Sequence, residues 1–477
     1  MPAKEEHRNI ATLTWGLFLL LALSAVFVAV GIPLGPVLLL SVVLILAFSF
    51  RYIYLTLYLG IAMMPFLGIM VSIPTGSLAI GARAFGGSID ISLGECILFF
   101  VAIAWGCKLL IQWYRRRDQS WRPRLPLIGT YLLVFAAHLV SAFSPLEPDP
   151  ILVVKYAFRP VLYDYLAFIV LPVNLLRSRK RYVAALGVLV AVGVFAALNG
   201  LVSIFFPVGG GLVGRVHPLP IFGVDALGEN WNELADLLVF TVPFTLALAG
   251  LVKKPQTKRL LQYAAAFQFF IALLTFARTI WIAFALQALF LCFTVWREAF
   301  KRHLSMLLVL GVVLLPLGIS MAAYSVSQTA EDSNSTRLML TGIALELYAS
   351  SPWVGAGAGT FLSNVGSTQV FLIEYGDPLD SHGFVQKLLA ETGTVGIVAM
   401  GLFLAQLSWL LWKGREHIRG EALTVYALLI SGTFGAFIYQ CFNTDYWTGK
   451  LWLPVGLLLA GMNVLRISQT KETGQNS

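Results

Sequence analysis

The sequence predicts an all-α protein, a polytopic integral membrane helical bundle of twelve to fourteen transmembrane helices with a large, partly helical outer loop. Composition is the first reason: of 477 residues, 58% are hydrophobic and 12% are charged, and the mean hydropathy is +0.81. In a soluble domain roughly a quarter of the residues are charged. The second reason is the recurrence of long apolar runs, each near the about twenty residues that a membrane-crossing helix needs.

The apolar runs define the predicted spans. The first run is followed by more apolar chain and is expected to be a permanent anchor, not a cleaved signal peptide. The number falls towards twelve if the short second run is not a span and if the runs flanking Arg278 form one bent helix. The predicted windows are 11–32, 34–50, 53–72, 91–112, 126–144, 156–176, 182–206, 231–252, 260–277, 279–296, 304–323, 384–412, 422–442 and 451–466.

Basic loops predict the orientation, because Lys and Arg are retained on the cytoplasmic side of short loops. With a cytoplasmic N-terminus, more than half of the 33 Lys and Arg fall in five inner runs: 115–124, 177–181, 253–259, 297–303 and 413–419. The net charge of +9 is thereby explained by topology, and no nucleic-acid partner is predicted. An even number of spans leaves both termini in the cytoplasm.

This topology divides the chain into four segments. Residues 1–206 are N-terminal transmembrane helices, and 207–323 are an outer arginine loop with the central transmembrane helices. Residues 324–382 form the large outer loop, expected to cap an outward cavity. Residues 383–477 are the C-terminal transmembrane helices and a cytoplasmic tail.

Eight bases fall on the outer face against the orientation bias and need a reason. Arginine suits a phosphate ligand through its bidentate fork; the alternative is that each base merely pairs with an outer acid. Arg278 is the sharpest case, because no acid lies within ten residues on either side. The eight are Arg83, Lys155, Arg159, Arg215, Arg278, Arg337, Lys387 and Lys450.

Four local patterns lie on the same outer face. They are 214–238, with Arg215 in a loop before a helix; 276–283, FARTIWIA; 335–361, an amphipathic helix that starts near Arg337 and ends in a glycine-rich turn; and 380–396, DSHGFVQKLLAETGTVG. The turn, Ser351 to Gly359, is expected to offer backbone N–H groups to an anion.

The last pattern permits two interpretations. His382 is either an acid–base group or a helix cap, and Gln386 lies about one turn further on the same face. Lys387 and Glu391 are four residues apart and are expected to neutralise each other. Near the first pattern, Asn230, Asn232 and Asp236 are expected to organise the loop-to-helix junction. The aromatic residues Trp353, Tyr375, Tyr446 and Trp447 could stack on sugars, or belong to the aromatic belt of a membrane interface.

The order of these motifs resembles the O-antigen ligase and O-antigen polymerase superfamily of bacterial envelopes. The resemblance covers residues 200–461. Asn232 to Ala235 matches an Asn-x-x-Ala helix after an arginine loop, and Ala277-Arg278 matches a dipeptide that usually begins with serine. Ligases also carry His, then Asn, Ser or Gln, then nine residues, then Gly-x-x-Gly; here His382 is followed by Gly383, nine residues and 393–396.

The resemblance implies a glycosyltransferase that moves a glycan from undecaprenyl diphosphate to an acceptor sugar hydroxyl. The acceptor would be lipid A core or a growing polysaccharide, in the bacterial inner membrane with the site facing the periplasm. His382, Arg215 and Arg278 are the expected catalytic residues, and the expected substrate-binding residues are Arg337, Asn232, Gln386 and Arg159. Histidine suits proton transfer near pH 7, and arginines suit a departing diphosphate.

Two choices stay open. Within the enzyme class, ligase and polymerase differ in the acceptor, and the glycine at position 383 favours the polymerase slightly. From another class, a transporter or flippase of lipid-linked glycans would also be polytopic, but no internal repeat is apparent. Neither a metal ion nor another cofactor is expected, because no cluster of Asp, Glu or His has ligand spacing.

Overall fold

A computed structural model describes residues 34–74, 88–116, 123–146, 149–206, 215–297, 302, 335–369, 371–372, 378–443 and 447–474. The chain divides into two compact units. The first comprises Met1–Gly60 and Cys96–Arg122, and the second comprises Ile61–Glu95 and Pro123–Ser477. All the predicted site residues belong to the second unit.

The first unit holds α2 (Leu34–Arg51), most of α3 (Ile53–Met63) and most of α4 (Leu93–Arg116). The chain bends by 111° between α2 and α3. The predicted span 53–72 is wrong at its end, since α3 stops at Met63. Pro65 and Gly68 follow directly, and a proline disfavours helix for the residue before it.

A β-hairpin that the sequence did not predict follows α3 in the second unit. Strand β1 (Met70–Pro74) pairs antiparallel with β2 (Ser88–Ser92), with Met70 opposite Ser92. A capping box then starts α4: Ser92 N–H donates to Glu95 Oε2 at 3.0 Å, and Glu95 N–H donates to Ser92 Oγ at 3.2 Å.

Helices form the rest of the second unit. The run from α6 (Pro150–Tyr156) to α7 (Leu171–Leu175) passes through two π-helical stretches, η2 (Ala157–Leu162) and η3 (Tyr165–Val170). An unlabelled helix covers 335–350. The others are α5 (Ile128–Val140), followed by the 3-10 turn η1 (Ser141–Phe143), α8 (Arg179–Ser203), α9 (Trp231–Leu251), α10 (Pro255–Leu274), α11 (Arg278–Thr294), α13 (Phe361–Gly366), α15 (Phe384–Arg415), α16 (Glu421–Gln440) and α17 (Gly449–Gly474).

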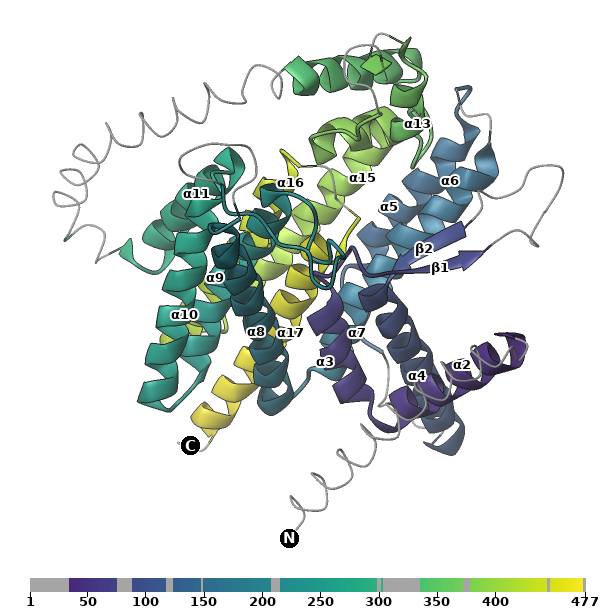
Figure 1. Cartoon of the computed structure of the whole chain (residues 1–477). Coiled ribbons are helices and arrows are strands. Elements are labelled where there is room, and N and C mark those ends of the chain that lie inside the picture. The colour runs from purple at the N-terminus through teal and green to yellow at the C-terminus, as the bar shows by residue number, and fades with distance from the viewer. Residues whose placement is uncertain are drawn as a thin grey trace. The chain divides into compact units, whose positions relative to one another are not determined.

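Helix α9 is the centre of this unit. It packs against α8, α10, α11 and α16, and most of its residues are buried (Figure 1). Beside this group, α5 packs along α15, and α17 packs along η3 and α16. Tyr131, Tyr165, Phe403, Trp447 and Trp452 form an aromatic cluster where these elements meet; Trp447 stacks on Trp452 with ring centroids 5.1 Å apart.

The predicted class is confirmed. In the described part of the chain, seven helices are long and apolar enough to cross a membrane, or eight if α2 and α3 form one bent span. The runs that flank Arg278 are two helices, α10 and α11, separated at 275–277. Windows 11–32 and 304–323 lie outside the described residues, so the total of twelve to fourteen stays a prediction.

Candidate functional site

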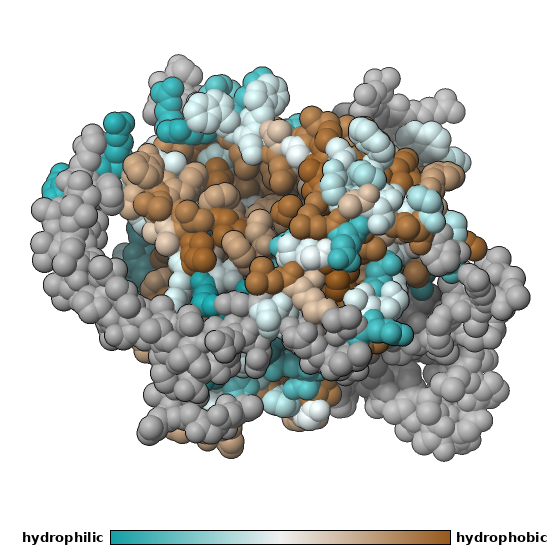
Figure 2. All heavy atoms as spheres, turned by 90° about the horizontal axis from the view of Figure 1, so that it is seen from above, coloured by the Kyte–Doolittle hydropathy of each residue, from teal (hydrophilic) through white to brown (hydrophobic). Residues whose placement is uncertain are grey.

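Several predicted site residues gather at one end of the second unit. Helix 335–350, α13 and the start of α15 lie at this end, and the C-terminal end of α17 lies at the other (Figure 1). Polar side chains are interspersed among apolar ones where this end is viewed from above (Figure 2). We call this the site end. It carries the starts of α9, α11 and α15.

Arg278 is placed by the break between α10 and α11. Thr275 closes α10 by donating from its Oγ1 to the carbonyl of Ala272 at 2.7 Å, and the same oxygen accepts from Ala277 N–H. Phe276 has φ 53°, the left-handed region, which turns the chain before it becomes helical again. Arg278 is therefore the first residue of α11, half-buried at the site end.

Arg337, in helix 335–350, lies near Arg278. Burial lowers the pKa of Arg337, the positive charge of Arg278 lowers it further, and Tyr439 of α16 raises it. The buried Nε of Arg337 has no hydrogen-bond partner among the described residues. Two like charges brought this close and out of water repel each other, so the described residues concentrate positive charge here.

His382 joins these arginines. It is half-buried, and burial lowers its pKa below the ordinary value; Arg337 lowers the pKa further, whereas Asp380 raises it. The imidazole therefore stays neutral at neutral pH and can accept a proton. No hydrogen bond holds the ring within the described part of the chain, so its backbone must orient it.

That backbone is fixed at both neighbours of His382. Ser381 Oγ donates to the carbonyl of Gly383 at 2.8 Å, and Ser381 N–H donates to Asp380 Oδ1 at 2.8 Å. The carbonyl of Gly383 also accepts from Lys387 N–H at 3.1 Å. His382 is thus held in the loop that leads into α15, and does not itself cap the helix with its ring.

The predicted attraction between Lys387 and Glu391 is present, but Lys387 has a second acidic partner that the sequence did not predict. Lys387 forms a salt bridge with Asp380, and both side chains are largely buried. Glu391 lies near enough to interact electrostatically, but its Oε1 accepts from Phe361 N–H at 3.2 Å. The preceding loop folds back over the first turn of α15, which spacing along one helix could not reveal.

Most N–H groups of the glycine-rich turn are used within the fold and are not available to an anion, contrary to the prediction. The turn docks on a break in α15 at Gly393, where φ is 60° and ψ is −157°. Ala356 N–H donates to the carbonyl of Ala390 at 2.7 Å, and Gly357 N–H donates to that of Glu391 at 3.0 Å. Beyond the break, Thr394 N–H donates to the carbonyl of Pro352 at 2.9 Å. The turn and the Gly-x-x-Gly motif therefore complete each other's hydrogen bonds.

Arg215 lies beside the start of α9. Its guanidinium carbon is 4.6 Å from the centre of the Trp231 ring, a cation–π contact. The next residue, Val216, donates its N–H to the carbonyl of Leu274 at 3.1 Å, four residues before Arg278. The loop is thus tied to the junction that places Arg278.

The start of α9 has the predicted structural role. Asn230 caps the helix, accepting at its side chain from Asn232 N–H at 2.9 Å and from Glu233 N–H at 3.3 Å. The carbonyl of Asn232 accepts from Tyr439 at 2.9 Å, and Tyr439 in turn interacts with Arg337. Sequence reasoning missed Tyr439, since nothing near it marks a site.

A cluster of one base and two acids, which we call the paired cluster, lies next to this junction. Lys450 of α17 is buried, pairs with Glu233 and lies 3.8 Å from Asp236 Oδ2. Gln440 Nε2 donates to the other oxygen of Asp236 at 2.9 Å. For Lys450, as for Lys387, the alternative of simple pairing with an outer acid is confirmed.

Gln386 covers the glycine that follows His382. A Cβ at Gly383 would overlap Gln386 Oε1 and would lie 3.0 Å from the carbonyl of Cys441. Gln386 Nε2 lies 3.5 Å from Thr341 Oγ1, one turn after Arg337. The space of the polar residue that ligases carry at this position is therefore filled by an amide from one turn along α15.

The remaining predicted residues lie further from these contacts. Arg159 is exposed on η2 and interacts electrostatically with the buried Asp164. Trp353 is exposed on the turn, whereas Trp447 packs in the aromatic cluster and is no platform for a sugar. Arg83, Tyr375 and Tyr446 lie outside the described residues.

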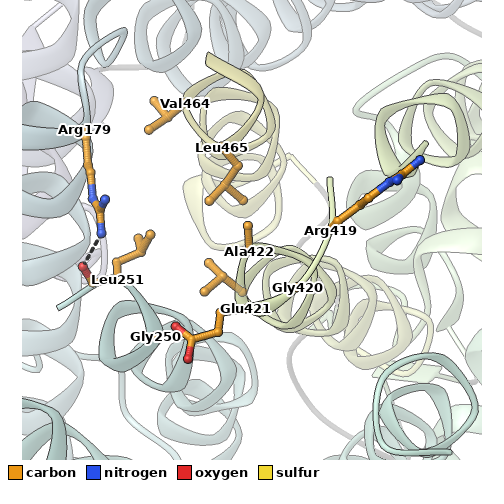
Figure 3. A pocket seen from close by; sticks show the side chains of 10 residues that line it. Arg179, Gly250, Leu251, Arg419, Gly420, Glu421, Ala422, Val464 and Leu465 are labelled. Carbon is orange, nitrogen blue, oxygen red and sulfur yellow. Dashed lines mark hydrogen bonds between the residues drawn. The ribbon is translucent and has the colours of Figure 1, made fainter. Parts of the chain in front are cut away.

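Two of the predicted inner basic runs contribute an arginine each, Arg179 and Arg419, to a cavity at the opposite end of the second unit. This cavity of about 510 Å³ lies between the start of α8, the end of α9, the start of α16 and α17. Arg179 in its wall donates to the carbonyl of Leu251 at 2.8 Å, which satisfies an end carbonyl of α9, whereas Arg419 extends away (Figure 3).

Comparison with protein families bears on the site directly. A family model described as O-antigen ligase matches residues 263–401, the stretch that contains Arg278, Arg337 and His382. This match confirms the resemblance to the O-antigen ligase and polymerase superfamily. The O-antigen ligase match does not reach Arg159, Arg215 or Asn232. No curated protein matches the chain.

The match of residues 263–401 to the O-antigen ligase family model supports an O-antigen ligase or polymerase activity. Such an enzyme is glycosyltransferase-like, acts on lipid-linked glycans and works in a membrane. The apolar helices and the O-antigen ligase match together indicate a multi-pass membrane protein.

Proposed function

We propose that the protein transfers a glycan from undecaprenyl diphosphate to an acceptor sugar hydroxyl, as an O-antigen ligase does. The observation that carries the proposal is the gathering of Arg278, Arg337 and His382 from three separate helical segments. An excess of positive charge beside a neutral histidine suits a reaction in which an anionic group leaves and a hydroxyl attacks.

The proposed step breaks the bond between the anomeric carbon and the diphosphate oxygen. As this bond breaks, negative charge grows on the diphosphate, and Arg278 and Arg337 stabilise it. His382 accepts the proton of the attacking hydroxyl, which forms the new glycosidic bond. Arg215 is assigned to the diphosphate as well, and Asn232, Gln386 and Arg159 to the glycan; these four assignments are expectations from the sequence.

A second candidate is the polymerase, whose acceptor is another lipid-linked repeat unit. Gly383 favours it slightly, because ligases carry a polar side chain there. Gln386 reduces that difference, since its amide fills the same space.

A transfer assay with the purified protein in lipid vesicles tests the proposal. The protein is given a lipid-diphosphate-linked glycan and each acceptor in turn. Transfer to lipid A core identifies a ligase, and chain growth on a second lipid-linked unit identifies a polymerase. Movement of the donor across the bilayer without any covalent change would overturn both in favour of a flippase. We expect transfer to survive EDTA, since we propose a reaction without a metal ion.

The same proposal places the site end on the periplasmic face of the bacterial inner membrane. Cysteine introduced at Ser335, beside Arg337, should react with a membrane-impermeant maleimide in intact spheroplasts. Labelling only after the membrane is opened would place the site in the cytoplasm and overturn the assignment.

A further inference from the structure

We propose that Lys387 is a positioning residue that holds the Asp380 carboxylate away from His382, so that His382 keeps its place and remains a neutral base. This inference rests on the proposed function, since it assumes that His382 accepts a proton. It assigns a role to the ion pair between Lys387 and Asp380. The sequence had predicted only that Lys387 and Glu391, within one helix, neutralise each other.

The contacts of Asp380 carry the first step. One carboxylate oxygen is bound to Lys387 Nζ, and the other accepts from Ser381 N–H at 2.8 Å. Asp380 and His382 are only two residues apart and interact electrostatically. These two contacts, one on each oxygen, set the orientation of the carboxylate, and no hydrogen bond between Asp380 and the imidazole is present among the described residues.

The rigidity of Lys387 carries the second step. Its side chain is 11% exposed, and it lies in the first turn of α15, with its own N–H bound to the carbonyl of Gly383. Glu391 and Tyr156 also attract the ammonium group. Glu391 in turn accepts a hydrogen bond from Phe361 N–H. Lys387 is therefore attracted by groups in the preceding loop, in α6 and in α15 itself.

The surroundings of His382 define what else acts on it. Arg337 faces it from helix 335–350, and Asp380 lies in its own loop. Lys387 and Glu391 belong to α15. Arg278 of α11 and Tyr439 of α16 act on Arg337, and Tyr156 of α6 acts on Lys387. Among these groups Asp380 is the acid that raises the proton affinity of His382, and Lys387 is the base bound to it.

Removal of Lys387 should therefore change the pH dependence of transfer in a defined direction. In Lys387→Met, the released carboxylate can bind the imidazole, so the pKa of His382 rises. The acid limb of the rate then moves to higher pH, by about one unit or more, as expected for an opposite charge within about 4–6 Å. In Asp380→Asn the attraction is lost, and the limb moves to lower pH.

The double variant Asp380→Asn/Lys387→Met tests the dependence of one effect on the other. Without the carboxylate, loss of the lysine should no longer raise the limb, so the double variant should follow Asp380→Asn. Glu233→Gln is the matched control, since it removes the acid partner of another buried lysine at the same end. Its limb should coincide with that of the unaltered protein.

The measurement is the initial rate of transfer from pH 5 to 9 with saturating donor, together with the thermal midpoint of each variant. An upward shift in Lys387→Met that disappears in the double variant supports the inference. A lower rate with an unmoved limb, or an upward shift that persists in the double variant, overturns it. If Lys387→Met does not fold, Asp380→Asn still tests the inference. An acid limb of Asp380→Asn at the same pH as in the unaltered protein would contradict the role of Asp380.

Failure of this inference is distinguishable from failure of the proposed function. Full activity of His382→Ala would remove the proposed base. If His382→Ala is inactive but the acid limbs of Lys387→Met and Asp380→Asn do not move, His382 remains the proposed base and only the role of Lys387 is excluded.

Discussion

Two clusters of charged residues at the site end differ in how their positive charges are compensated. In the paired cluster, beside the start of α9, Lys450 is paired with Glu233 and lies near Asp236, and Gln440 donates a hydrogen bond to Asp236. Between α11, helix 335–350 and α15, by contrast, Arg278 and Arg337 lie close enough to repel each other. The first arrangement is complete as it stands. A bound anion would stabilise the second arrangement, which is why we assign it to the diphosphate.

The largest effect is expected at the histidine of the second cluster. His382→Ala should lower the transfer rate by a factor of about 10² to 10⁴, the usual contribution of a general base, while donor binding persists because it is assigned to the arginines. Turnover and donor binding should be measured on the same purified variant. A normally folded and fully active variant would exclude the catalytic role.

A substitution in the paired cluster should lower the stability of the protein and not only its transfer rate. Lys450→Met leaves two carboxylates near each other at a buried position, and breaking a buried ion pair costs about 3–5 kcal/mol. We expect a clear fall in the thermal midpoint of the purified protein. Arg337→Met should leave the midpoint unchanged or raised, since it removes a repulsion. Equal losses in the two variants would mean that the clusters do not differ.

The break in α15, on which the second cluster depends, gives a prediction of intermediate size. Gly393→Ala should destabilise the protein by about 1–3 kcal/mol for its backbone conformation alone. The added Cβ would also lie 2.6 Å from the carbonyl carbon of Trp353. Gly401→Ala, in the same helix with open space around it, should be neutral or stabilising. Unfolding in urea compares the two, and similar midpoints would contradict the docked arrangement.

The smallest effect concerns the shape of an arginine. Arg278→Lys keeps the charge but loses the bidentate fork, so we expect transfer to fall about tenfold and less than in Arg278→Ala. Donor titration with both variants gives the difference. Unchanged activity in the lysine variant would show that charge alone suffices.

Much of the fold follows from local sequence. Apolar runs of membrane length predicted the position of most helices. Whether the runs that flank Arg278 form one bent helix or two was left open by the sequence, and the structure shows two, separated at 275–277. Where a run contained Pro65 and Gly68, length alone was misleading, because backbone conformation ended α3 before the apolar composition did.

Three of the predicted site residues lie close together in the structure, but their contacts were not predictable. Arg278, Arg337 and His382 stood out because each is a polar group beside an apolar run, and the superfamily motif marked the histidine. Helical spacing predicted the attraction between Lys387 and Glu391, but not the salt bridge between Lys387 and Asp380, which a folded-back loop supplies. Tyr439 carried no local signal, because its role depends on α16 ending beside α9.

The sequence by itself determined which segments are helical, which end of each helix carries charge, and which residues are suited to phosphate chemistry. These properties depend on neighbours within a few residues, where the helical period and the apolar content decide. Only the tertiary structure decided which charges neutralise each other, and that the glycine-rich turn repairs the break at Gly393 instead of binding an anion. Those outcomes depend on groups far apart in the chain, which only packing brings within hydrogen-bond distance.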